Sequence, residues 1–140
     1  PMAIRELEQF IEDNRDHKEA RLALAQHIIF EQPEKAIRLI EDFSMAYKFY
    51  DEANYIKDLV AFSQHQPDDS TVGKKISAAQ LAAKNGDIEA AIQLIIEATT
   101  SDKNYAEELP RKTGVALFRT LGTQHPLTKS YRWKFDMVLY

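Results

Sequence analysis

Histidines and acidic side chains are the residues of this sequence with the clearest potential for acid–base or metal chemistry. The four histidines are His17, His27, His65 and His125. No two of them stand four residues apart, the spacing that places two imidazoles on one helix face for a metal ion. His65 lies near Asp68 and Asp69, but the surrounding QHQPDDS is typical of a solvated turn. The sequence therefore predicts no metal site.

No residue pattern in this sequence indicates a catalytic site. Its four glycines are isolated, so a nucleophile elbow, a phosphate-binding loop and a dinucleotide-binding loop are all missing. The acidic pairs Asp68-Asp69 and Glu107-Glu108 are neighbours in sequence, which does not bring either pair together around a substrate. The absence of cysteine excludes disulfides, thiol redox chemistry and thiolate metal sites. We expect a protein that is not an enzyme and that has no cofactor.

Charge is distributed unevenly along the chain, whose net charge is −4. Residues 110–140 carry six Lys and Arg against one Asp, whereas the residues before them carry 12 Lys and Arg against 21 Asp and Glu. This asymmetry indicates charge pairing between helices or an acidic partner. It disfavours nucleic acid, because the acidic body would repel a phosphate backbone. We expect protein partners and no nucleic acid.

Neither a membrane span nor a signal peptide is expected from the hydropathy pattern. No apolar run approaches the roughly 20 residues that a membrane-spanning helix needs, and the N-terminus lacks a basic stretch followed by an apolar one. The expected localisation is therefore cytoplasmic, without a membrane partner.

The secondary structure of the chain is predicted to be helical throughout. Apolar residues recur at helical spacing along almost the whole chain, and Gly, Pro, Asn or Asp punctuates the breaks. The predicted fold is all-α, with about eight helices in antiparallel hairpins stacked as a tetratricopeptide-like α-solenoid. We expect one domain over residues 1–140. It would contain irregular repeats at about 17–44 and 75–102, a linker helix at about 48–63, and a C-terminal helix pair at about 106–140.

The clearest hairpin signal lies between Ile76 and Asp102. A helix rich in alanine is followed by Asn85-Gly86-Asp87 and then by a second amphipathic helix. Gly86 suits the left-handed position that ends a helix, and Asp87 suits the N-cap of the next one. Small residues on the first helix allow the second to approach closely, which is typical of stacked helical hairpins.

The last helix, which begins near Pro126, carries two apolar stripes on nearly opposite faces. The first stripe consists of Leu127, Tyr131, Phe135, Val138 and Leu139, and the second of Trp133, Met137 and Tyr140. One core cannot cover both faces. We therefore predict that the second stripe, together with the neighbouring cations, forms a partner-binding site, composed of Arg132, Trp133, Lys134, Met137 and Tyr140.

Residues Asn85 to Tyr140 also resemble the C-terminal end of the bacterial chaperedoxin (CnoX/YbbN) family. The resemblance rests on short matching pieces at similar spacing: Gly86-Asp87 with Ala91, Arg111-Lys112, Leu121-Gly122, Pro126-Leu127, Tyr131-Arg132 and Leu139-Tyr140. Proteins of that family have a thioredoxin-like domain followed by a tetratricopeptide-like domain. The resemblance implies that this chain is the second of these, that Pro1 marks a domain boundary, and that the thioredoxin-like domain is absent from the chain.

Family membership of this kind would imply a co-chaperone. Chaperedoxins hold unfolded or oxidation-threatened client proteins and pass them to the chaperonin GroEL, so the last helix would be the docking element. Trp133 stands where the family pattern usually has a second basic residue, and we expect the docking surface to be partly aromatic here. The alternative is a structural role, in which both stripes are buried within the domain or in a homodimer.

Overall fold

The computed structural model describes residues 2–140, and its regular secondary structure in that range is helical, with no strand. Eight helices follow one another along it: α1 (Met2–Asp13), α2 (Lys18–Ile28), α3 (Pro33–Ile40), α4 (Tyr50–Gln64), α5 (Thr71–Lys84), α6 (Ile88–Asp102), α7 (Tyr105–Leu121) and α8 (Pro126–Leu139). This confirms the predicted all-α, tetratricopeptide-like helical solenoid.

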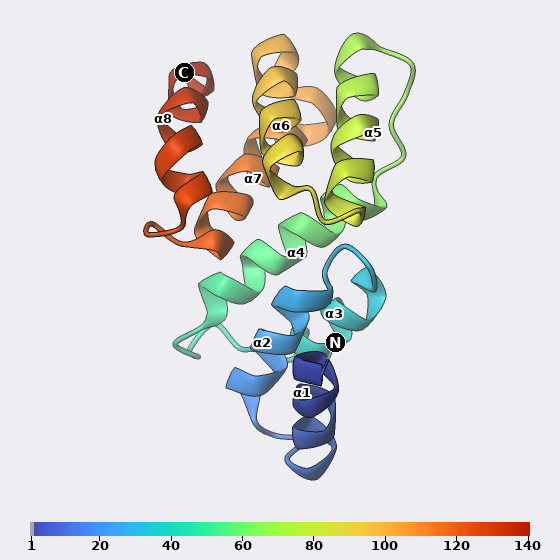
Figure 1. The fold of residues 1–140 in the computed structure, drawn as a ribbon, viewed down its shortest axis with the longest axis vertical. Helices are drawn as coiled ribbons and strands as arrows, with labels where there is room; N and C mark the ends of the chain where they lie inside the picture. Colours follow the sequence, from blue (N-terminus) through green and yellow to red (C-terminus); the bar gives the residue numbers. More distant parts are fainter. Residues whose placement is uncertain (1) are drawn as a thin grey trace.

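Helix α4 lies obliquely across the middle of the molecule and divides it into two halves (Figure 1). Helices α1, α2 and α3 form one half, in which α2 packs against both α1 and α3. In the other half, α6 packs against α5, α7 and α8. Helix α4 contacts α3 on one side and α7 on the other, although α7 follows it by some 40 residues in sequence. The helix expected to be a linker is therefore a central packing element.

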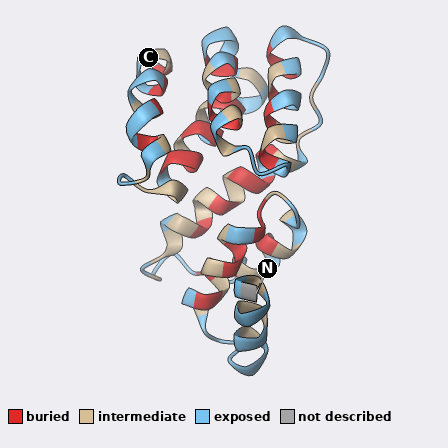
Figure 2. Cartoon of the chain, viewed as in Figure 1, coloured by how far each residue is buried: buried red, intermediate tan, exposed pale blue. Residues whose placement is uncertain are grey.

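One continuous apolar core runs through both halves (Figure 2). Its largest fully buried side chains include Phe62 of α4 and Phe135 of α8. Phe30, just after α2, packs edge-on against Phe62 with ring centroids 6.4 Å apart, and so joins the first half to α4. Each fully buried side chain of this size stabilises the fold by about 1.5–3 kcal/mol through the hydrophobic effect. The core therefore depends on α4 for its continuity.

The turn between α5 and α6 confirms the sequence-based prediction for Gly86 and Asp87. Gly86 has φ of +82°, the left-handed region that a residue without a Cβ enters at little cost. The Asp87 backbone N–H donates to the Ala82 carbonyl at 2.9 Å, which closes the end of α5. The Asp87 carboxylate then accepts from the Ala90 backbone N–H at 3.1 Å and caps α6.

Helix α7 begins differently from the regular helix expected from about residue 106. Ala106, Glu107 and Glu108 have φ of +49°, +58° and +66°, a left-handed turn made without glycine. Each such residue costs roughly 1–2 kcal/mol relative to a right-handed conformation. Pro110 follows at the start of the right-handed part, where its fixed φ and missing N–H are tolerated.

Candidate functional site

The inward face of α8 is the stripe expected to pack against the core. Tyr131, Phe135 and Leu139 are buried, and Leu127 and Val138 are partly buried against the same core. Phe135 lies against Phe118 of α7 with ring centroids 5.6 Å apart. This stripe is therefore accounted for by contacts with the rest of the molecule.

The outward face of α8 carries the second stripe, which stays exposed to solvent. Trp133 is 56% exposed, Met137 71% and Tyr140 94%. Large apolar and aromatic side chains of this kind are enriched at protein interfaces and dominate their binding energy. The structure thus brings together three of the five residues predicted to bind a partner and leaves them uncovered.

The two predicted cations of the site have different surroundings. The Arg132 guanidinium donates to Asp136 Oδ1 at 3.0 Å and lies 5.9 Å from the Phe118 ring centroid, so it points toward α7. The Lys134 ammonium lies 5.5 Å from the Tyr131 ring centroid and 5.7 Å from that of Trp133. Lys134 therefore adjoins the exposed stripe, whereas Arg132 is already paired within its own helix.

A polar cluster fixes the orientation of α8 on α6. The Tyr131 hydroxyl donates to Glu89 Oε2 at 2.6 Å and accepts from Gln93 Nε2 at 2.9 Å. The bond to Glu89 is the main reason that the pKa of Tyr131 is raised above its usual value, with burial adding to it. Lys103 donates to the Leu139 carbonyl at 3.0 Å and so caps the C-terminal end of α8. These contacts determine which face of α8 is exposed.

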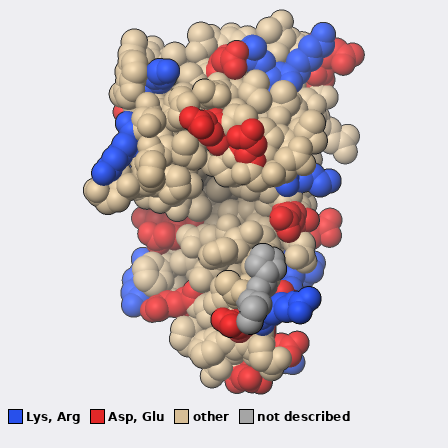
Figure 3. All heavy atoms as spheres, viewed as in Figure 1, with Lys and Arg blue, Asp and Glu red and all other residues tan. Residues whose placement is uncertain are grey.

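A second candidate site, which the sequence analysis did not predict, is a groove between the two halves. It has a volume of about 270 Å³ and lies where the end of α2, the middle of α4, the α5–α6 turn and the end of α7 meet. Figure 3 shows this face of the molecule hollowed between its upper and lower halves. Its floor and walls include Ile29, Phe30, Leu59, Ile88, Leu117 and Leu121, and its polar lining includes Gln26, His27, Glu31, Lys84 and Thr120.

The chemistry available in the groove is that of binding. Its walls are mainly aliphatic and aromatic, and its charged rim residues Glu31 and Lys84 are of opposite sign. The Thr120 hydroxyl is buried without a hydrogen-bond partner. Such a groove can take up one large apolar side chain and offer polar contacts to the backbone beside it.

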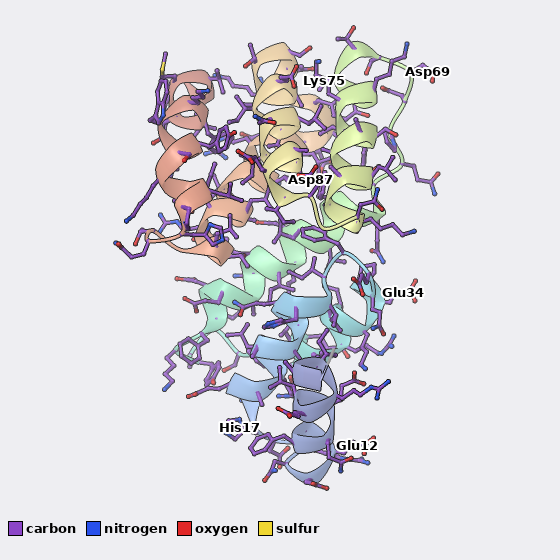
Figure 4. The ribbon with its side chains drawn as sticks, in the orientation of Figure 1. Glu12, His17, Glu34, Asp69, Lys75 and Asp87 are labelled. Atoms are coloured by element: carbon purple, nitrogen blue, oxygen red, sulfur yellow. The ribbon has the colours of Figure 1, made fainter. Side chains whose placement is uncertain are left out.

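The loop between α4 and α5, considered above as a metal site, is held by hydrogen bonds. The Tyr105 hydroxyl lies 3.1 Å from His65 Nε2 and accepts from the Asp68 backbone N–H at 3.3 Å. Asp68 accepts from the Ser70 hydroxyl and backbone N–H, and these bonds hold the pKa of its carboxyl below the usual value. Asp69 and His17 lie near opposite ends of the molecule (Figure 4). Across residues 2–140, no group of three His, Asp or Glu could hold a metal ion.

Between residues 2 and 140, no helix combines the length and the apolar character needed to cross a bilayer.

Comparison with known proteins identifies α4 and the four helices that follow it. The family model described as Tetratricopeptide repeat matches residues 50–140, the segment from the start of α4 through α8. Among curated proteins and solved structures, none matches the chain.

Proposed function

Since this chain belongs to the tetratricopeptide repeat family, we propose that it is the interaction domain of a co-chaperone. Tetratricopeptide repeats generally mediate protein–protein interaction and are generally not enzymes. The specific proposal is that this domain belongs to a thioredoxin-like protein, helps to hold unfolded clients, and docks to the chaperonin GroEL. The similarity of residues 85–140 to chaperedoxins supports this proposal.

The exposed stripe of α8 is the observation that carries the proposal. Trp133, Met137 and Tyr140 are exposed on one face of a helix whose opposite face packs against the core. Leaving such side chains in water forgoes hydrophobic stabilisation, which a partner recovers when it covers them. We assign chaperonin docking to this stripe, with Lys134 contributing a positive charge beside it.

Client holding is assigned to a different surface, the groove between the halves. Its apolar walls match the large apolar side chains that an unfolded chain exposes. The two assignments place clients and chaperonin on separate surfaces, so that both are accessible in one molecule.

The test compares the chain with a variant combining Trp133→Ala and Met137→Ala. Both residues are more than half exposed, so the fold is expected to be unchanged by circular dichroism. GroEL binding, measured by interferometry, is expected to weaken at least about tenfold, because each lost 1.4 kcal/mol of contact is a factor of ten in affinity. Met45→Ala is the matched control, since Met45 is 82% exposed in the α3–α4 connection.

Retention of GroEL binding by the double variant would overturn the assignment to α8, and lack of binding by the unmodified chain would overturn chaperonin docking. Client holding is read separately, as suppression of aggregation of a denatured client. Leu121→Glu, which puts a charge in the groove, is expected to reduce it, whereas the α8 double variant is not.

A structural role is the alternative, because the same apolar stripe could pair two copies of the chain. Light scattering would then show a dimer, and Trp133 fluorescence would be blue-shifted only in that dimer. A monomer with solvent-exposed Trp133 at all concentrations favours the co-chaperone proposal.

A further inference from the structure

We infer that the element covering α8 is an acidic amphipathic helix of a partner protein, which packs lengthwise along the exposed stripe. This inference rests on the proposed function in one respect only, that the outward face of α8 is a docking surface. It adds the secondary structure and the charge of the element that docks there.

The spacing of the exposed positions on α8 is that of a helix–helix seam. Pro126, Ser130, Trp133, Met137 and Tyr140 are all exposed and follow one another at intervals of four, three, four and three residues. Alternation of four and three keeps side chains on one line along a helix and is the pattern by which two helices pack lengthwise. The large side chains gather at one end of the line, and the small Ser130 lets a partner helix approach closely at the other.

The surroundings of α8 leave room for such a helix. Its inward face packs against α6 and α7, and its outward face has no neighbouring helix among residues 2–140 (Figure 1). An added helix would therefore extend the side-by-side packing of α5, α6 and α8. The hydrogen bonds of Tyr131 and Lys103 hold α8 in place, so the seam is formed before the partner arrives.

Two lysines on opposite edges of the seam determine the charge of the partner. At 100° per residue, Lys129 lies on one edge and Lys134 on the other, and both are exposed. Neither forms an ion pair within the described part of the chain, and Asp136, on the same edge as Lys129, is bound by Arg132 at 3.0 Å. The charges of the residues that flank a helix–helix seam determine which partner helix binds there. Glutamates at the flanking positions of the partner would pair with both lysines.

The same charges disfavour a second copy of this chain as the occupant. Antiparallel packing of α8 on α8 around a two-fold axis would place each edge of one copy beside the same edge of the other, so the two Lys134 side chains would meet along an edge where α8 has no acidic residue. Like charges across such a seam destabilise it. An acidic helix has the opposite effect, and we therefore choose it over self-association.

The experiment uses Trp133, the only tryptophan of the chain, as its probe. Two synthetic helical peptides of about three heptads carry leucine at the seam positions. One has glutamate at all flanking positions and the other has lysine. Addition of the glutamate peptide is expected to shift Trp133 emission to the blue. The same peptide is expected to bind at least about tenfold tighter than the lysine peptide, with a preference that weakens as salt is added.

Charge reversal on the protein supplies the decisive comparison. Lys129→Glu combined with Lys134→Glu is expected to reverse the peptide preference, whereas Lys74→Glu, at an exposed position on α5, leaves it unchanged. Equal affinity for the two peptides, lack of a fluorescence shift, or dimerisation that buries Trp133 without peptide would each overturn the inference. Loss of GroEL binding with peptide discrimination intact would overturn only the chaperonin proposal. GroEL binding without discrimination between the two peptides would overturn only the inference of an acidic partner helix.

Discussion

At the residue scale, Gly114 of α7 lies against the ring of Phe135 on α8 with no room for a side chain. A Cβ added to it would lie 2.2 Å from Cζ of Phe135, whose ring is fully buried. Because protein interiors are close-packed, the ring has little freedom to move away. Gly114→Ala is therefore expected to lower the free energy of unfolding by about 1–3 kcal/mol, even though alanine favours the helix itself by about 1 kcal/mol. Urea denaturation measures the change.

The control for Gly114→Ala replaces Phe135, the residue that the new methyl group would meet, with a smaller side chain. Phe135→Leu removes the ring atoms that the new methyl group would meet, so Gly114→Ala is expected to cost less in that background than in the unmodified chain. A double-mutant cycle gives the coupling between the two positions. A neutral or stabilising effect of Gly114→Ala in the unmodified chain would contradict the close packing of Gly114 against Phe135.

Residue-scale features were predictable where their cause is local. Gly86 and Asp87 could be assigned from their own types because a helix end and an N-cap are satisfied within a few residues. The Tyr131 hydrogen bond to Glu89 spans 42 residues, and no short-range pattern indicates it. The position of Gly114 against Phe135 depends likewise on how two helices meet. Residue type and spacing thus predicted the cap of α6 and the exposed stripe of α8, but not the contacts that hold the helices together.

At the element scale, Asp58 is a carboxylate on α4, the helix that packs against α7. Burial raises its pKa above the usual 3.8, and the positive charge of Lys112 on α7 partly opposes the shift. The native state thus binds the Asp58 proton more tightly than the unfolded state does. The ionised form consequently costs stability above the folded pKa, and that cost disappears as the pH falls through the folded pKa toward 3.8.

Asp58→Asn removes this ionisation cost. The variant is expected to be more stable than the unmodified chain at pH 7, by less than about 1 kcal/mol because solvent screens a partly exposed group. The gain is expected to vanish below pH 3.8. Urea unfolding at pH 7 and pH 3.5 measures the difference, with the exposed Asp69→Asn as the matched control. An equal gain at both pH values would mean that the effect does not come from ionisation of Asp58.

Helix positions were largely predictable because amphipathic periodicity and capping residues are local signals. The exception is the start of α7, where a regular helix was expected from about residue 106 and a left-handed turn occurs at 106–108. Sequence rules disfavour that conformation for Ala and Glu. Contacts made by its neighbours hold it in place: Tyr105 binds His65 and the Asp68 backbone, and Leu109 and Pro110 are buried. Tertiary contacts therefore override the local preference.

At the scale of the whole molecule, the class of fold was predictable and the role of α4 was not. Stacked helical hairpins follow from the spacing of apolar residues along each helix. A helix that contacts α3 before it and the distant α7 after it cannot be recognised from one segment alone. The groove was missed for the same reason, since four segments from Gln26 to Leu121 contribute to its lining. Long-range packing determines these features.

The boundary of the family match at residue 50 coincides with the start of α4 and suggests how the molecule divides. A fragment of residues 50–140 keeps the packing of α4 on α7 and all contacts of α6 with α5, α7 and α8. It loses the contacts of α2 and α3 with α4, including Phe30 against Phe62. We expect this fragment to stay helical and to unfold cooperatively, with stability lowered by about 2–5 kcal/mol, the range for losing one or two large core side chains.

The complementary fragment, residues 1–49, is expected to behave differently. It carries α1, α2 and α3 without the helix that closes their core, and chains of this length seldom bury enough apolar surface to fold alone. Circular dichroism with thermal unfolding of both fragments tests the division. A cooperative transition for 50–140 and none for 1–49 would mean that α4 forms a stable unit with the helices after it, on which the first three helices fold. Absence of a transition in both would mean that α4 needs contacts on both sides, and that the two halves form one cooperative unit.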